Sequence, residues 1–167
     1  MRVRDATPAD RAAIFAVHAA AFRTEREAEV AVALDPEASL VAEEDGRVVG
    51  HVVLSRLAVE DGYRAVALGP IGVLPEAQGR GLGSALVRAA LAAARDAGED
   101  AVVLLGNPAY YGRFGFVAAT SVGLPDPFGW RDAFQIVVLG APPPRGAVPL
   151  WPRPFLVAGT PAAAVQV

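Results

Sequence analysis

Three glycines within five residues, Gly79, Gly81 and Gly83, lie where an apolar run that ends at Leu74 is followed by a helical pattern that begins at Leu82. At such a strand–turn–helix corner, the first N–H groups of the helix have no partner inside the helix, and the positive end of the helix dipole lies beside them. Glycine permits left-handed turns and lets the backbone approach a ligand closely. The corner therefore predicts an α/β fold with an anion site, most often for phosphate, with a ligand-free tight turn as the alternative.

Two common phosphate-binding patterns fit this corner poorly. A P-loop ends in a lysine, and the chain contains no lysine. A dinucleotide-binding fingerprint, G-x-G-x-x-G, would begin at Gly79 but has Ser84 where a third glycine or alanine belongs. The acids Glu99 and Asp100 lie near the expected downstream distance, so a dinucleotide-binding protein stays open as a weaker hypothesis.

The composition excludes several other classes of site. The chain has no cysteine, and its two histidines lack a carboxylate at ligand spacing, so we expect no disulfide and no metal site. All 15 basic residues are arginines without a cluster, and the net charge is −3, which disfavours nucleic acid. Mean hydropathy is +0.36, yet no 18-residue window lacks charged groups. We therefore expect a cytoplasmic protein without a membrane partner.

Turn signals and apolar periodicity predict the order of elements. Asp45-Gly46 between two apolar runs is a strong hairpin signal. Gly69-Pro70 predicts either a bulge inside a strand or an end of its pairing near Pro70. Thr24 and Glu27 form a capping-box pattern that would open the second helix. The predicted strands are residues 1–6, 39–44, 47–57, 64–73, 101–105, 116–122 and 134–140, and the predicted helices are residues 8–21, 24–35, 82–97 and 108–115. We expect one domain over residues 1–157 and a disordered tail over residues 158–167.

The segment QGRGLG, Gln78 to Gly83, resembles the Q/R-x-x-G-x-G/A motif of the GNAT (Gcn5-related) N-acetyltransferase superfamily. The segments "ALGPIGVLPEAQGRGLGSALV" and "NPAYYGRFGF" are similar to that superfamily's strand, loop and helix and to its later short helix. The resemblance extends from residue 1 to about residue 139 and is closest to a small, uncharacterised subgroup. It implies a mixed, mostly antiparallel sheet of about seven strands with four helices, splayed between the fourth and fifth strands.

The resemblance also implies a reaction and its participants. The protein would be an acetyl-CoA-dependent N-acetyltransferase that passes the acetyl group directly to a primary amine of a small molecule, amino acid or peptide. Acetyl-CoA would be a cosubstrate, no metal would take part, and a homodimer is left open. A non-catalytic acyl-CoA-binding or sensing module is the alternative, because the strand "AVALGPIGV" has no carboxylate.

The same resemblance assigns the cosubstrate to particular residues. Gly72 and Val73 would pair with the pantetheine arm and orient the acetyl carbonyl. Asn107 is also placed in the cofactor site, and it would share a helix face with Tyr111. The pyrophosphate would lie on the backbone amides of the corner, with the Arg80 side chain reaching an adjacent phosphate, and these amides come from Gln78, Gly79, Arg80, Gly81, Leu82, Gly83 and Ser84.

Tyr111 matches the family's common general-acid tyrosine. The departing CoA sulfur leaves more readily if a proton is delivered as its bond breaks, and a tyrosine keeps its proton at neutral pH. Residues four apart share a helix face, so Tyr110 and Phe114 are predicted to pack in the core. A Tyr111 that only packs against the cofactor is the alternative.

The general base and the acceptor pocket are less defined by the sequence. His51 is the candidate base on a strand, and Glu25 and Glu27 are candidates on the second helix; a structural histidine is the alternative for His51. Phe128 and Trp130 in a late loop are predicted either to wall an acceptor pocket or to close the core.

Overall fold

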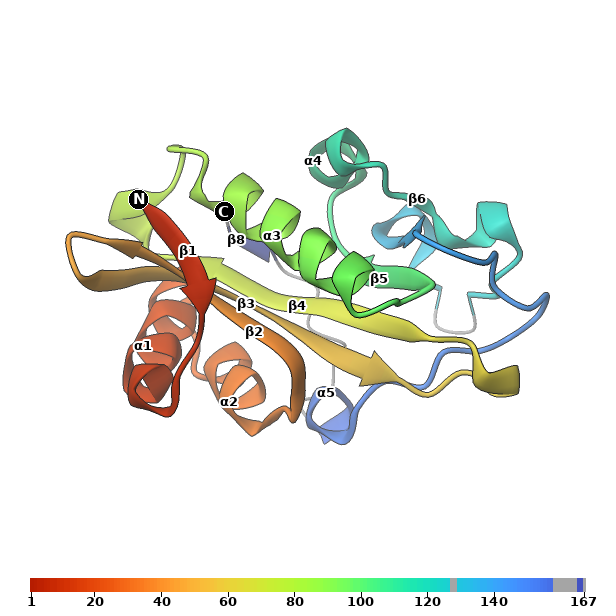
Figure 1. The fold of residues 1–167 in the computed structure, drawn as a ribbon, viewed down its shortest axis with the longest axis horizontal. Coiled ribbons are helices and arrows are strands. Elements are labelled where there is room, and N and C mark those ends of the chain that lie inside the picture. The colour runs from red at the N-terminus through yellow and green to blue at the C-terminus, as the bar shows by residue number, and fades with distance from the viewer. Residues whose placement is uncertain (127–128, 158–164, 167) are drawn as a thin grey trace.

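A twisted sheet with helices on both faces forms the body of the protein (Figure 1). The structure is a computed structural model, and it describes residues 1–126, 129–157 and 165–166. The strands are β1 (Arg2–Asp5), β2 (Pro36–Glu44), β3 (Arg47–Leu57), β4 (Ala65–Val73), β5 (Ala101–Leu105), β6 (Val117–Ala118), β7 (Phe134–Val138) and β8 (Val165–Gln166). The helices are α1 (Arg11–Phe22), α2 (Arg26–Ala33), α3 (Leu82–Asp96), α4 (Pro108–Tyr111) and α5 (Arg153–Val157).

The strand order within the sheet is β1-β2-β3-β4-β5-β7-β6, and β8 pairs with β4 outside this path. Neighbouring strands are antiparallel except for the parallel pairs β4–β5 and β4–β8. The predicted mixed, mostly antiparallel sheet of seven strands is confirmed, and β8 adds a short strand that the sequence did not suggest.

Each face of the sheet buries a separate set of apolar side chains, because successive strand residues point to opposite faces. α3 covers one face, where Leu86 packs in a cluster with Val52. α1 and α2 cover the other face, where Val30 packs in a cluster with Val53 (Figure 1). β5 is buried at every residue, as its continuous apolar sequence predicts.

Two turn signals of the sequence are confirmed. Asp45 and Gly46 both have positive φ, 50° and 76°, as a tight hairpin turn requires, and they join β2 to β3. Leu68 of β4 pairs with Leu54 of β3, and Ile71 pairs with Val52. Between these two pairs β4 advances by three residues and β3 by only two. The bulge therefore lies at Gly69-Pro70, where it was predicted.

Beyond this bulge the sheet opens between β4 and β5. Their ladder joins Ala65–Ala67 to Ala101–Val103 and does not continue toward the end of β4. On the edge of β4 opposite β5, the strand β3 pairs with Ile71, Gly72 and Val73. β8 pairs with Ile71 and Gly72 on the edge that β5 has left. The predicted splay between the fourth and fifth strands is thus present, and β8 lies in it.

Several local predictions were wrong. The capping box does not form, because Thr24 accepts a hydrogen bond from the nearer amide of Arg26, at 3.1 Å, and α2 begins without a side-chain cap. The predicted strand over residues 116–122 is confined to β6, since residues 119–122 turn into a 3₁₀ helix that ends at Gly123, with φ of 92°. In the proline-rich residues 141–157, for which no element was predicted, the chain forms α5, whose Phe155 is fully buried in the core.

The predicted disordered tail falls mostly on residues 158–164 and 167, which lie outside the described residues. Within the described part of the chain, no helix combines the length and the apolar character that crossing a bilayer requires.

A buried carboxylate links the loop after α3 to β3 and to the residue before β4. Glu99, whose side chain is 1% exposed, accepts hydrogen bonds from Arg56 and Arg64. Burial works against its charge, but the two guanidiniums outweigh burial and lower the pKa of Glu99. Its stabilising effect is therefore present above the pKa of an unfolded glutamate, about 4.3, and is lost as the pH falls through the lower folded pKa.

Replacing Glu99 by glutamine should lower the free energy of unfolding at pH 7 by about 2 kcal/mol, the usual loss for charge-assisted hydrogen bonds. Glu37→Gln is the matched control, because Glu37 contacts the same Arg56 at an exposed position, where an ion pair contributes about 0.5 kcal/mol. Urea unfolding at pH 7 and in acid measures both. Equal losses for the two variants, or a Glu99 effect that persists in strong acid, would contradict this account.

Candidate active site

The glycine corner follows β4 as the sequence predicts. Gly79 and Gly81 have left-handed φ values of 73° and 84°, which glycine adopts without strain. Nε2 of Gln78 donates a hydrogen bond to the carbonyl oxygen of Val73, at 3.0 Å, and so ties the loop to the end of β4. α3 then begins at Leu82 with Gly81 as its N-cap and without a side-chain cap. The first amides of α3 are therefore available to an anion.

A cavity of about 250 Å³ lies at this corner. Its walls combine the predicted backbone with two side chains from the α4 region, Tyr110 and Arg113. The guanidinium of Arg113 lies 4.7 Å from the centre of the Tyr110 ring, which adds a positive charge to the site. The predicted residues brought together here are Val73, Gln78, Gly79, Gly81, Leu82, Gly83 and Ser84.

Three predicted cofactor residues lie elsewhere. Arg80 does not line the cavity, and its Nη2 donates a hydrogen bond to Oε1 of Glu44, at 3.0 Å. Asn107 caps α4, with Oδ1 accepting a hydrogen bond from the amide of Ala109 at 2.9 Å. Gly72 lies one residue before the cavity and pairs with His51 on one edge and with Gln166 on the other.

The burial of the two tyrosines of α4 differs from what the helix faces predicted. Tyr110 does contact Phe114, with ring centroids 5.6 Å apart, but it is only half-buried, and its hydroxyl lies 3.3 Å from Ser84 Oγ. Tyr111 is the fully buried residue and packs against Phe116. α4 is one turn long and continues as a 3₁₀ helix, so the four-residue rule does not extend across it.

The hydroxyl of Tyr111 is buried and has no hydrogen-bond partner among the described residues. Burial, with a smaller effect of Tyr110, raises the pKa of Tyr111 well above its ordinary value, so the group holds its proton at neutral pH. Its ring lies against Gly106, where an added Cβ would come within 2.3 Å of Cε2. Gly106 at the end of β5 therefore sets the position of this ring.

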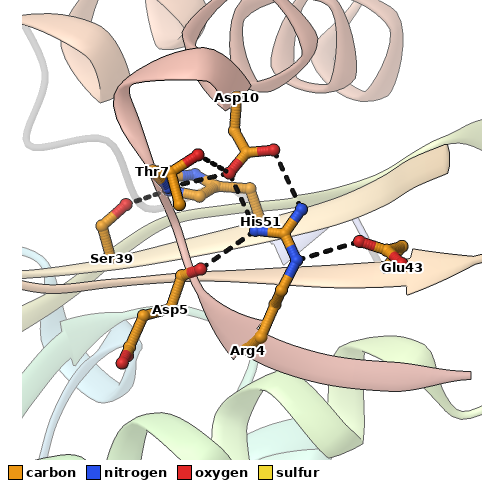
Figure 2. Close-up of polar contacts among 7 residues, drawn as sticks. All are labelled: Arg4, Asp5, Thr7, Asp10, Ser39, Glu43 and His51. Atoms are coloured by element: carbon orange, nitrogen blue, oxygen red, sulfur yellow. Dashed lines mark hydrogen bonds and ion pairs between the residues drawn. The ribbon is translucent and has the colours of Figure 1, made fainter. Parts of the chain in front are cut away.

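His51 is part of a buried pair and does not line the cavity. Its Nδ1 lies 2.8 Å from Nε2 of His18 on α1. Its Nε2 lies 2.8 Å from Oγ of Ser39 on β2 (Figure 2). Burial lowers the pKa of His51 to about 3, with the charge of Asp10 acting in the opposite direction. Asp10 is in turn bound by Arg4 and Thr7 (Figure 2). The predicted lone histidine is thus neutral and has a neutral partner.

The remaining candidates for the base and the acceptor pocket lie on and around α2. Glu25 lines a groove of about 690 Å³ between α2 and α5. Glu27 is partly buried, and its Oε2 has no partner in the described part of the chain. Trp130 packs against Phe134 and Trp151 and so contributes to the core. Phe128 lies outside the described residues. The described part of the chain contains no cluster of three or more metal-ligating side chains.

Comparisons with known proteins place this fold and corner in one family. The sequence profile of the acetyltransferase (GNAT) family matches residues 8–116. The uncharacterised N-acetyltransferase YhbS of Escherichia coli K12 is 34% identical over 143 residues, which is 81% of this chain and 86% of YhbS. The chain belongs to the GNAT family and is an N-acetyltransferase.

Two solved structures are similar over almost the whole chain. One is a GNAT family acetyltransferase from Brucella melitensis in complex with acetyl-CoA, with 36% identity, a TM-score of 0.79, and coverage of 92% of this chain and 97% of that chain. The other is YhbS from Escherichia coli in complex with CoA, with 30% identity, a TM-score of 0.84, and coverage of 93% and 91%.

Proposed function

We propose that the protein transfers the acetyl group of acetyl-CoA directly to a primary amine, with the pyrophosphate of acetyl-CoA in the glycine corner. The observation that carries this proposal is the corner itself. Left-handed glycines lead into an uncapped α3, and Arg113 adds a positive charge to the same cavity. Amides at a helix start favour a phosphate, and a cation beside them strengthens that preference. The acetyl-CoA and CoA complexes of the two similar structures support the choice of ligand.

The splay beyond the bulge is the proposed path of the pantetheine arm, with Gly72 and Val73 offering backbone groups on the edge that β5 leaves open. In this structure β8 pairs with that edge at Ile71 and Gly72. A strand edge hydrogen-bonds one partner at a time, so the arm can bind there only after β8 has left. The cavity at the corner does not depend on this exchange.

Tyr111 is the proposed general acid. When the amine attacks the thioester carbon, the electron pair of the C–S bond passes to the sulfur, and a proton is needed there. The Tyr111 hydroxyl keeps its proton because burial raises its pKa, and it has no other partner among the described residues to compete for that proton. A buried hydroxyl without a partner is costly to the fold, which favours a functional reason for keeping it.

The acceptor is proposed to enter from the α2 side of the sheet. The groove between α2 and α5 carries charges of both signs, with Glu25 and Glu29 beside Arg26 and Arg153. Such a mixed lining suits a small amine, an amino acid or a peptide that carries both charges. It gives no preference for a strongly acidic polymer such as nucleic acid.

A panel of amines tests the proposed reaction. The protein is incubated with acetyl-CoA and, separately, with ethanolamine, free amino acids and short peptides with free N-termini, and released thiol is followed together with product mass. At least one amine should give thiol release that depends on both protein and amine, with one acetyl group added to the amine. Binding of acetyl-CoA without amine-dependent release would instead favour the sensing module, which the absence of a carboxylate on β4 supports.

A further inference from the structure

A hydrogen-bonded chain of three side chains extends from the centre of the sheet toward its surface. His18 lies on α1, His51 on β3 and Ser39 on β2, and each consecutive contact is 2.8 Å long. His18 and His51 are at most 1% exposed, whereas Ser39 is half-buried. We call these three residues the histidine chain; its outer contact, between His51 and Ser39, is drawn in Figure 2.

The inner end of the histidine chain points at β4. A Cβ added to Gly72 would lie 3.1 Å from Nδ1 of His18, so the imidazole fills the place of a side chain at this strand position. That Nδ1 is buried and has no hydrogen-bond partner among the described residues. β4 carries no carboxylate, and Gly72 is a position proposed above for the acetyl-bearing arm. Nδ1 of His18 therefore occupies the place that a basic side chain at position 72 of β4 would occupy.

Both imidazoles are neutral, because burial lowers the pKa of each ring and His51 further lowers the pKa of His18. A neutral imidazole has one N–H and one lone pair. The hydrogen bonds of the histidine chain can therefore run in either of two consistent directions. If Ser39 accepts from His51 and His51 accepts from His18, the lone pair of His18 is on Nδ1. The opposite direction places an unsatisfied N–H on Nδ1. The first direction is favoured, because buried N–H groups without an acceptor are rarer in proteins than buried acceptors without a donor.

We propose that Nδ1 of His18 receives the proton released by the attacking amine and that His51 and Ser39 pass a proton on to the solvent. This inference rests on the proposed function. The amine nitrogen forms its bond to the acetyl carbon and gives its proton to His18 Nδ1. His18 Nε2 then gives its proton to His51 Nδ1, His51 Nε2 gives its proton to Ser39 Oγ, and the hydroxyl proton of Ser39 goes to water. The sulfur takes the Tyr111 proton, and Tyr111 regains a proton from water that enters the site as the products leave. The histidine chain returns to its first tautomers by taking a proton from water at Ser39 and releasing one to water at His18 Nδ1.

The relay explains how two buried histidines can serve as a base. A buried imidazole is a poor resting place for a proton, because its charged form is desolvated. A chain avoids this difficulty, since a proton enters at one end as another leaves at the half-buried end. The carboxylate of Asp10, fixed by Arg4, favours positive charge on His51 while the proton passes.

The ring nitrogens can be observed directly, because the chain contains only two histidines. Protein labelled with ¹⁵N-histidine is studied by long-range ¹H–¹⁵N NMR at pH 7, and His51→Gln assigns the two spin systems. We expect both rings to carry their proton on Nε2, with Nδ1 of His18 unprotonated. A proton on Nδ1 of His18, or a doubly protonated ring, would overturn the proposal whether or not an amine acceptor has been found.

Variants test the passage of the proton with ethanolamine, or with whichever amine of the panel releases thiol fastest. His18→Asn keeps a polar atom near Nδ1 but breaks the contact with His51, and His18→Gln does the reverse. Both should lower turnover at least ~100-fold, the lower range for general base catalysis, with acetyl-CoA affinity within ~3-fold of the unchanged protein. Ser39→Ala should lower turnover ~10-fold. Normal turnover in both His18 variants would overturn the proposal.

Two controls separate the relay from a structural role and from a rival base. Ser55 is a fully buried serine on β3 of the same sheet, and its Oγ has no partner among the described residues, so Ser55→Ala should leave turnover unchanged. In mixtures of H₂O and D₂O, turnover should depend on deuterium content along a curve, since several protons move together, and Ser39→Ala should make this dependence closer to linear.

If Glu27→Gln abolishes turnover while the His18 variants stay active, Glu27 is the base and the proposal fails. If no amine releases thiol, the proposed function fails, and the nitrogen spectrum still decides the state of His18.

Discussion

Tyr111→Phe should lower turnover with a reactive amine by ~10²- to 10⁴-fold and leave acetyl-CoA affinity almost unchanged. The substitution keeps the ring that packs against Phe116 and Gly106 and removes only the hydroxyl. Because this hydroxyl is buried without a partner among the described residues, its loss should not lower the free energy of unfolding. Thiol release, calorimetric titration and urea unfolding measure the three quantities on the same preparation.

Tyr110→Phe is the matched control on the neighbouring residue. Tyr110 lines the corner cavity, and its hydroxyl lies 3.3 Å from Ser84 Oγ, so its removal should alter acetyl-CoA affinity a few-fold and turnover little. Equal, small effects on turnover at both tyrosines would show that Tyr111 only packs. A Tyr111 variant that loses affinity but keeps its turnover would place Tyr111 in cofactor binding instead.

Ser84→Asp should weaken acetyl-CoA binding by at least ~100-fold. Ser84 is in the first turn of α3 and lines the cavity, so a carboxylate there would face the pyrophosphate at short range. Two like charges about 5 Å apart repel by roughly 3 kcal/mol at an effective dielectric constant of 20, which corresponds to a factor of more than 100. An acid in the first turn favours the helix itself, so the variant should stay folded. A substitution at Gly81 would be harder to interpret, because its φ of 84° strains any side chain.

Ala92→Asp provides the matched control, since Ala92 is an exposed residue of α3 beyond its first turns. It adds the same charge to the same helix away from the cavity, and it should change affinity less than ~3-fold. Calorimetric titration with acetyl-CoA compares the two variants with the unchanged protein. Similar affinities for Ser84→Asp and the unchanged protein would move the pyrophosphate away from the corner.

The features that the sequence predicted well depend on short-range signals. The hairpin follows from Asp45-Gly46, the bulge from Gly69-Pro70, and the corner from three glycines before an amphipathic helix. Each signal acts within a few residues, through backbone conformations that glycine and proline permit or force. The mixed sheet and its splay between the fourth and fifth strands came from the family resemblance, because no local pattern specifies which strands will part.

The features that the sequence missed depend on contacts between distant segments or on a change of helix type. His18 and His51 are separated by 33 positions, and neither carries a local sign of the other. The deeper burial of Tyr111 than of Tyr110 accompanies the 3₁₀ turn after α4, which the four-residue rule does not describe. Arg113 was the cation of the "PAYYGRFGF" segment, and its charge could have suggested a phosphate contact.

The most direct test of the central claim is a calorimetric titration of the unchanged protein with acetyl-CoA and, in parallel, with NAD. We expect one acetyl-CoA site per chain with a dissociation constant in the micromolar range, a binding free energy of about −8 kcal/mol, and no measurable heat from NAD at the same concentrations. Absence of binding by acetyl-CoA, or tighter binding of NAD, would contradict the assignment of the glycine corner and favour a dinucleotide-binding protein.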